Sequence, residues 1–151
     1  MNLLVSACLL GVSCRYDGRS KPLAQLDRLL KSDVHLVPIC PEVLGGLPTP
    51  RVPSERRGNG VVMHDGRDVT ENYRRGAEEA LYLARLTRCA CALLKERSPS
   101  CGCGRIYDGT FTGTLIDGNG VAAELLLQNG LRVFGESQLD ELLDFIRSSA
   151  K

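Results

Sequence analysis

The sequence lacks an excess of charge of either sign and lacks a long apolar run. Its 19 Lys and Arg residues nearly balance 18 Asp and Glu residues, which gives a net charge of +1. This balance does not supply the broad basic field of a nucleic-acid-binding surface. No stretch reaches the roughly 18 apolar residues of a membrane-spanning helix, and the start MNLLVSACLLG has no basic region. We therefore expect a soluble, cytoplasmic protein that binds neither a membrane nor nucleic acid stably.

Histidine is scarce, and closely spaced cysteine pairs of the zinc-binding kind are absent. The two histidines argue against a His-rich zinc or copper centre. Seven cysteines are an odd number in a chain without an export signal, which argues against a disulfide framework. No two of them form the C-x₂₋₄-C pair of a structural zinc site. The thiols are therefore expected to be core residues, nucleophiles or metal ligands.

Apolar runs alternate with helical patterns along the chain. Short apolar runs predict strands at residues 2–7, 34–39, 60–63, 89–95 and 131–135. Helical periodicity predicts helices at residues 22–32, 68–86, 121–130 and 137–149. The alternation predicts an α/β fold, with an open, mainly parallel sheet and helices on both faces. We expect residues 1–151 to form a single domain.

Two long segments rich in proline and glycine separate these elements. Segments 40–60 and 96–120 are expected to be functional loops, because long loops inside a compact domain usually serve a site. Tyr107 and Phe111, in the second loop, are expected near the rim of the cysteine site, mainly as residues that pack in the core. Four residues are expected at helix ends: Pro22 in a first turn, Thr70 and Ser137 as N-caps, and Gly130 just past a C-terminus.

Three cysteines follow predicted strands. Cys8 ends the first strand, Cys40 follows the second, and Cys101 lies in the loop after the strand at 89–95. Ligands of open parallel sheets bind outside the carboxyl ends of the strands. We therefore expect these three thiols to meet at the C-terminal edge of the sheet.

The other four cysteines fall into two pairs. Cys89 and Cys91 lie within an apolar strand and are expected in the core. Cys14 and Cys103 share the loops of Cys8 and Cys101, so their pattern fits either ligands or bystanders.

Three converging thiolates are compatible with several chemistries. Well-separated cysteines suit an iron–sulfur cluster, and three protein ligands on a four-iron cluster leave one iron open as a Lewis acid. A thiol-dependent hydrolase needs a nearby histidine, whereas His35 lies within a strand pattern and His64 beside a turn, both typical of structural or surface residues. The non-enzymatic alternative is a zinc or closed iron–sulfur module that only fastens the loops together.

Four stretches resemble the signatures of the thiouracil desulfidase family, long described only as a bacterial domain of unknown function. They are SACLLGVSCRYDG, CPEVLGGLPTPRVPSE, GRDVTENYRRGAEEAL and LLKERSPSCGCGRIYDGTFTG. The resemblance implies a [4Fe-4S] cluster held by Cys8, Cys40 and Cys101. It also implies non-redox removal of sulfur from thiolated uracil, or a related thiolated nucleobase or nucleotide, with the sulfide bound by the open iron. The catalytic pair that the resemblance implies is Glu42 with Ser98.

The chemistry of the residues near the cysteines suggests their roles. Glu42, two residues after Cys40, is a carboxylate that can accept a proton from the attacking water. Ser98 is either a proton relay or an ordinary turn serine. Ser100, two residues later, is the alternative candidate for the catalytic serine and is also a candidate to bind substrate. Arg51 is a candidate phosphate ligand, since guanidinium groups match phosphate well. Tyr16 either stacks on a base or packs.

Overall fold

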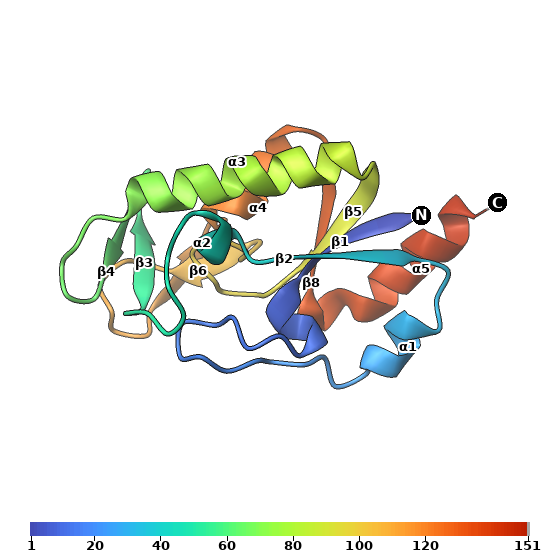
Figure 1. Cartoon of the computed structure of the whole chain (residues 1–151), viewed down its shortest axis with the longest axis horizontal. Helices are drawn as coiled ribbons and strands as arrows, with labels where there is room; N and C mark the ends of the chain where they lie inside the picture. Colours follow the sequence, from blue (N-terminus) through green and yellow to red (C-terminus); the bar gives the residue numbers. More distant parts are fainter. Residues whose placement is uncertain (151) are drawn as a thin grey trace.

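The computed structural model describes residues 1–150, and its centre is a four-stranded parallel sheet (Figure 1). The strands lie in the order β2-β1-β5-β8. Their bounds are β1 (Asn2–Ser6), β2 (His35–Ile39), β5 (Cys89–Leu94) and β8 (Arg132–Gly135). The central strands β1 and β5 are apolar almost throughout, because both of their faces are covered. The predicted α/β fold with a parallel sheet is confirmed.

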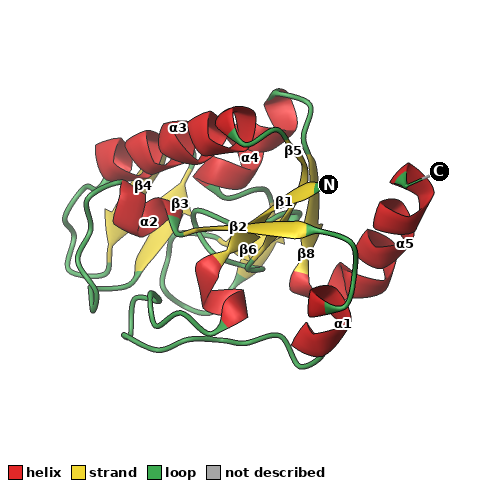
Figure 2. Cartoon of the chain, turned by 45° about the vertical axis from the view of Figure 1, so that its right-hand side comes forward, coloured by secondary structure: helices red, strands yellow, loops and turns green. Residues whose placement is uncertain are grey.

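Helices cover both faces of this sheet, as expected (Figure 2). One face packs against α3 (Thr70–Leu86) and α4 (Val121–Gln128), and the other against α1 (Leu26–Leu30) and α5 (Leu139–Ser149). Alternation along β1 divides its side chains between two apolar clusters. Leu3 and Val5 join the cluster of α5, while Leu4 joins that of α3 and α4.

Segments 40–60 and 96–120 contain regular structure, so their prediction as loops was wrong. The first holds α2 (Pro41–Leu44) and β3 (Ser54–Arg57), and β3 pairs antiparallel with β4 (Gly60–Met63). The second holds the antiparallel pair β6 (Arg105–Tyr107) and β7 (Leu115–Asp117). The strand predicted at 60–63 exists, but it lies in this hairpin and outside the parallel sheet. Strand β3 reads SERR, which gives no apolar signal.

Three of the four predicted helix-end residues have other roles. Pro22 precedes α1, which begins only at Leu26. The Thr70 hydroxyl accepts a hydrogen bond from the Val61 N–H at 2.9 Å, so it joins α3 to β4 and does not cap the helix. Ser137 lies in the 3₁₀ turn η2 (Glu136–Gln138) that precedes α5. Gly130 has φ +85° just past α4, so its predicted position is confirmed.

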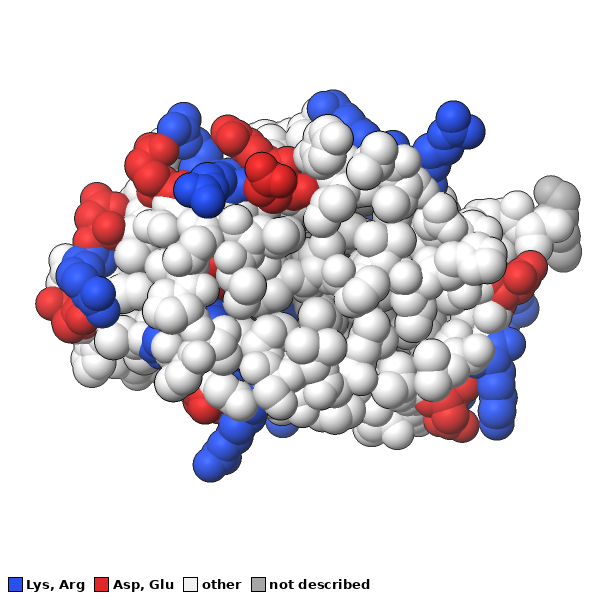
Figure 3. Space-filling model, viewed as in Figure 1, with Lys and Arg blue, Asp and Glu red and all other residues white. Residues whose placement is uncertain are grey.

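Positive and negative side chains are mixed over the surface. In the face shown in Figure 3 they gather over α3 and at the two ends of the molecule, and the middle is largely free of them. No helix within residues 1–150 combines the length and the apolar character needed to cross a membrane.

Helix α2 packs on α3 with almost no space between the two backbones. A Cβ added at Gly76 of α3 would lie 1.9 Å from the carbonyl oxygen of Pro41. A Cβ added at Gly45, after α2, would lie 2.0 Å from the carbonyl oxygen of Asn72, whose side-chain amide donates to the Gly45 carbonyl at 2.9 Å. Since α2 carries Glu42, this contact sets where that carboxylate lies.

Gly76→Ala tests this close approach. Alanine is normally favoured over glycine in a helix by about 1 kcal/mol. Here the clash with Pro41 should reverse the sign and lower the free energy of unfolding by about 2 kcal/mol, as overpacking does. Urea denaturation measures the change, and Glu79→Ala on the exposed face of α3 should shift it by less than about 0.5 kcal/mol. A Gly76→Ala protein as stable as wild type would contradict the packing described.

Candidate functional site

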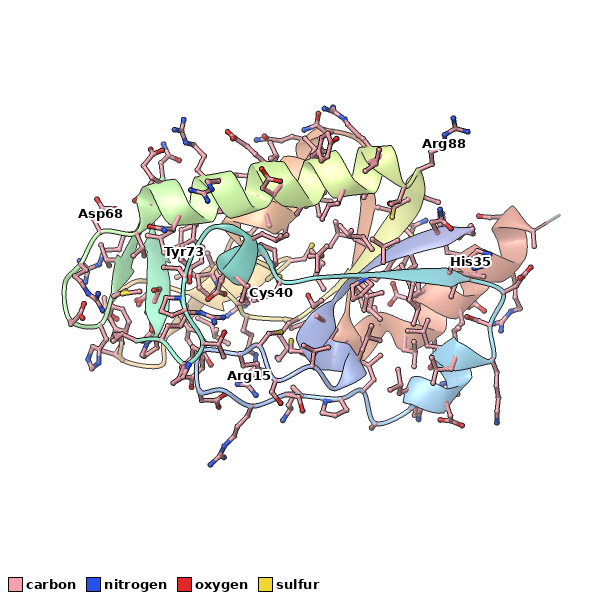
Figure 4. The ribbon with its side chains drawn as sticks, in the orientation of Figure 1. Arg15, His35, Cys40, Asp68, Tyr73 and Arg88 are labelled. Atoms are coloured by element: carbon pink, nitrogen blue, oxygen red, sulfur yellow. The ribbon has the colours of Figure 1, made fainter. Side chains whose placement is uncertain are left out.

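A cavity of about 540 Å³ opens where β1, β2 and β5 end. Its volume falls in the range of small-molecule sites, roughly 300–1,000 Å³. Four cysteines line it. Cys8 lies in the 3₁₀ helix η1 (Ala7–Leu10) directly after β1, Cys14 lies beyond η1, Cys40 follows β2, and Cys101 lies in the loop after β5. Figure 4 shows Cys40 beneath α2, at the opposite end of β2 from His35.

The thiols of this cavity are largely withdrawn from water. Burial, and then the neighbouring Cys40 thiol, raises the pKa of Cys8 to about 11. Burial raises the pKa values of Cys14 and Cys101 to about 12, with Cys40 adding to both shifts. These thiols are therefore protonated at neutral pH, and metal binding would displace their protons.

The other three cysteines lie away from the cavity lining. Cys89 and Cys91 are buried in β5, which confirms their expected place in the core. Cys103 is half-buried and packs against the cluster beneath α3 and α4. Of the two cysteines with open roles, the structure brings only Cys14 to the cavity.

The thiols do not form the close tetrahedron of a zinc site. Among residues 1–150, no three His, Cys, Asp or Glu side chains converge on a point that one metal ion would occupy. A mononuclear ion requires such convergence, whereas an iron–sulfur cluster takes each thiolate on a different iron.

Glu42 lies beside these thiols and is held from two sides. The Arg51 Nε donates to Glu42 Oε1 at 3.0 Å, and the Ser100 hydroxyl donates to Oε2 at 2.8 Å. The side chains of Arg51 and Glu42 are only 3% and 14% exposed, so water screens this ion pair weakly. The buried Tyr73 faces the same carboxylate from α3, and burial followed by the charge of Glu42 raises the pKa of Tyr73.

Arg51 also binds three other oxygens, all from the protein. Its terminal nitrogens donate to the Cys14 carbonyl at 2.9 Å, the Pro48 carbonyl at 3.2 Å and the Thr49 hydroxyl at 3.2 Å. Burial lowers the pKa of Arg51, but the charge and hydrogen bond of Glu42 outweigh this and raise it overall. The guanidinium therefore joins α2 to the Cys14 loop, and its donors are largely committed to the protein.

The two serines of the Cys101 loop form a chain that ends at Glu42. The Ser98 and Ser100 hydroxyl oxygens are 2.9 Å apart, and Ser100 donates onward to Glu42. Ser98 also accepts from the backbone N–H groups of Ser100 and Cys101, both at 3.1 Å. Ser98 therefore has the turn-forming role that its sequence allowed, and it reaches Glu42 only through Ser100.

The cavity mouth carries exposed side chains. Tyr16 is 42% exposed and lines the mouth, with the Arg15 guanidinium 5.8 Å from the centre of its ring. Tyr16 is thus accessible to a bound molecule.

Several residues in or near the cavity were missed or differently expected from sequence. Tyr73 faces Glu42 but does not line the cavity, and it resembled any apolar residue on the buried face of α3, so nothing marked it. His64 is exposed, as expected, but it lines the cavity and contacts Phe111, whose ring was expected mainly to pack. Ser54 lies at the start of a strand with no apolar signal. The hairpins bring Ser54, His64 and Phe111 to the cavity, and neither hairpin was predicted.

Replacing Arg51 by Met tests the energetic weight of the ion pair. The change leaves the Glu42 carboxylate largely buried without its partner, so it should lower the free energy of unfolding by about 3 kcal/mol. Urea unfolding of the metal-free protein measures this. The matched control is Arg74→Met, which breaks the exposed pair with Glu71 and should cost less than about 1 kcal/mol. Equal losses in the two variants would show that the pair with Glu42 has no special role.

Comparisons with known proteins agree with this geometry. Residues 3–138 match the family described as 2-thiouracil desulfurase. The Bacillus subtilis (strain 168) protein YbbK, described as uncharacterized, is 45% identical over 151 residues, covering 93% of this chain and 99% of its own. A solved structure of the [4Fe-4S]-dependent thiouracil desulfidase TudS (DUF523Vcz) is 50% identical, with a TM-score of 0.90 over 97% of both chains. The chain belongs to the 2-thiouracil desulfurase family.

Proposed function

We propose that this chain is a cytoplasmic, [4Fe-4S]-dependent desulfidase that replaces the sulfur of thiolated uracil, or of a related thiolated nucleobase or nucleotide, with oxygen. Residues 1–151 form one desulfidase domain in this proposal. The observation that carries it is the Glu42 carboxylate, fixed by Arg51 and Ser100 beside four cysteine thiols in one cavity. The 50% identity to a desulfidase of this kind supports the same conclusion.

Three of the four cavity cysteines are assigned as cluster ligands. Cys8, Cys40 and Cys101 each follow a different strand of the sheet, so they approach the cavity from separate directions. Thiolates are the usual ligands of iron–sulfur clusters, so this donor set fits the group. When bound through three thiolates, such a cluster supplies an iron that can bind the soft sulfur of a thiocarbonyl and withdraw electron density from its carbon. Cys14 is then a fourth, unassigned thiol.

The overall exchange consumes water and no electrons. A thiocarbonyl and one water give a carbonyl and hydrogen sulfide, so the protein must remove a proton from the attacking water. Glu42 is assigned this role. A carboxylate has about four lone-pair directions, and Arg51 and Ser100 occupy two of them. At least one direction therefore stays open toward water in the cavity.

The remaining residues orient this base and the substrate. Arg51 positions Glu42 in place of the phosphate binding expected from sequence. Ser100 holds the second carboxylate oxygen, and Ser98 relays protons through Ser100. Tyr16 is assigned to the stacking of a base at the mouth, where its ring is accessible. The substrate is a small molecule, since a cavity of about 540 Å³ has the size of a small-molecule site.

Single Cys→Ser replacements separate ligands from bystanders. Changing Cys8, Cys40 or Cys101 should lower the iron content of anaerobically reconstituted protein and abolish sulfide release. Cys103→Ser is the matched control, because Cys103 is only half-buried and lies away from the cavity. Iron analysis and absorption near 400 nm measure the outcome. A Cys101→Ser protein with full iron, beside a Cys103→Ser protein without it, would reverse the assignment.

Glu42→Gln separates proton transfer from cofactor binding. Glutamine keeps the size of the side chain but cannot act as the base. The rate of sulfide release should fall roughly 10²–10⁴-fold, the scale of general acid–base catalysis. The iron content should stay that of wild type. Glu124→Gln, which weakens a pair with Arg56 outside the cavity, serves as the control and should leave the rate unchanged. A fully active Glu42→Gln protein would remove Glu42 from the mechanism.

A further inference from the structure

One buried hydroxyl in the cavity has no hydrogen-bond partner. Ser54 begins β3 and lines the cavity, and its Oγ is the only buried side-chain nitrogen or oxygen within residues 1–150 that is left unpaired. Tyr73 lies near enough for its pKa to respond to Ser54, but no well-formed hydrogen bond joins the two. A buried hydroxyl is unfavourable without a partner, so this atom points to a molecule that supplies one.

Two aromatic rings line the same cavity as this hydroxyl. His64, just after β4, and Phe111, between β6 and β7, have ring centres 4.8 Å apart and planes inclined by 30°. The His64 N–H donates to the carbonyl of Pro53 at 2.9 Å, which fixes His64 next to the start of β3. The cavity lining therefore combines a pair of packed aromatic rings with the unpaired Ser54 hydroxyl.

The backbone of Phe111 is held in an unusual conformation. Its φ is +59°, a region that bulky residues seldom adopt and that tends to occur at functional sites. One oxygen of Glu55 accepts from the N–H groups of Gly109 and Phe111, at 3.0 and 3.1 Å. The Arg57 Nε donates to the Gly109 carbonyl at 2.7 Å. Strand β3 thus supplies both the unpaired Ser54 and the residues that fix the Phe111 loop.

We propose that Ser54, His64 and Phe111 bind the pyrimidine ring of the substrate. The ring stacks against the aromatic pair, and the Ser54 hydroxyl hydrogen-bonds an amide-like N–H or C=O on its edge. An apolar wall with one well-placed polar group is what recognition of a flat, polar-edged heterocycle requires. This inference rests on the proposed function, because it assigns the ring of that substrate to these residues.

Binding of uracil tests the proposal apart from the chemistry. Uracil has the ring but no sulfur, and calorimetry on the full-length, cluster-loaded protein measures its affinity. Phe111→Leu keeps an apolar side chain without an aromatic face and should weaken binding about tenfold. Ser54→Ala removes one neutral hydrogen bond and should weaken it roughly fivefold. Phe111→Tyr should retain wild-type affinity. Tyr82→Ala, an exposed aromatic of α3 outside the cavity, is the control and should also bind normally.

Steady-state sulfide release gives a second readout. Ser54→Ala and Phe111→Leu should raise KM for 2-thiouracil and leave kcat within about twofold, because these residues bind the ring and do not activate water. A merely structural role would lower kcat and iron content together. Phe111→Tyr keeps the aromatic face, so it should keep the wild-type KM if the ring stacks on the substrate. Uracil affinity unchanged in both variants, or no uracil binding by wild type, would overturn the inference.

The two proposals fail in different ways. If uracil binding depends on Ser54 and Phe111 but the wild-type protein releases no sulfide from 2-thiouracil, the ring assignment stands and the desulfidase proposal is wrong. If sulfide is released and the variants bind uracil as wild type does, the desulfidase proposal stands and the ring assignment is wrong.

Discussion

The ion pair between Arg51 and Glu42 joins the parts of the site that come from distant segments. Arg51 contacts α2 through Glu42 and the Cys14 loop through a carbonyl, while Ser100 brings the Cys101 loop to the other carboxylate oxygen. Breaking a buried pair by removing one partner leaves an uncompensated charge, which is strongly destabilising. The same contacts that fix the Glu42 carboxylate therefore also hold the cysteine-bearing loops around one cavity.

The cysteines themselves are poor candidates for holding the site together before a metal binds. Burial raises the pKa values of Cys8, Cys14 and Cys101, so these thiols stay neutral and gain little from one another. The site is instead held together by the close contact of α2 with α3 and by the ion pair between Arg51 and Glu42. A cluster would thus bind in a cavity whose side chains are already held in position. Its binding would require the cysteine thiols to release their protons.

The sequence allowed the parallel sheet to be predicted because its strands are buried on both faces and so are continuously apolar. Cys8, Cys40 and Cys101 could be placed near one another for the same reason, since each follows such a strand.

The hairpins escaped prediction because β3 is charged. Arg57 binds a backbone carbonyl and Glu55 binds backbone N–H groups of the Phe111 loop, and no periodicity reveals such contacts. The contacts of Arg51 with Glu42 and the Cys14 carbonyl could not be foreseen, because composition cannot distinguish a solvent-facing arginine from one whose donors are satisfied internally. The same limit applied to Ser98 and Ser100, two residues apart, of which only Ser100 contacts Glu42 directly.

In the proposed reaction, water that is deprotonated at Glu42 supplies the oxygen that replaces sulfur, without any transfer of electrons. The most direct test is the anaerobic reaction of 2-thiouracil with the cluster-loaded protein in ¹⁸O-labelled water, with no reductant added, followed by mass spectrometry of the uracil and assay of sulfide. The expected product is uracil that carries a single ¹⁸O atom, with an equal amount of sulfide. Unlabelled uracil, or turnover that requires an added reductant, would contradict the proposed reaction.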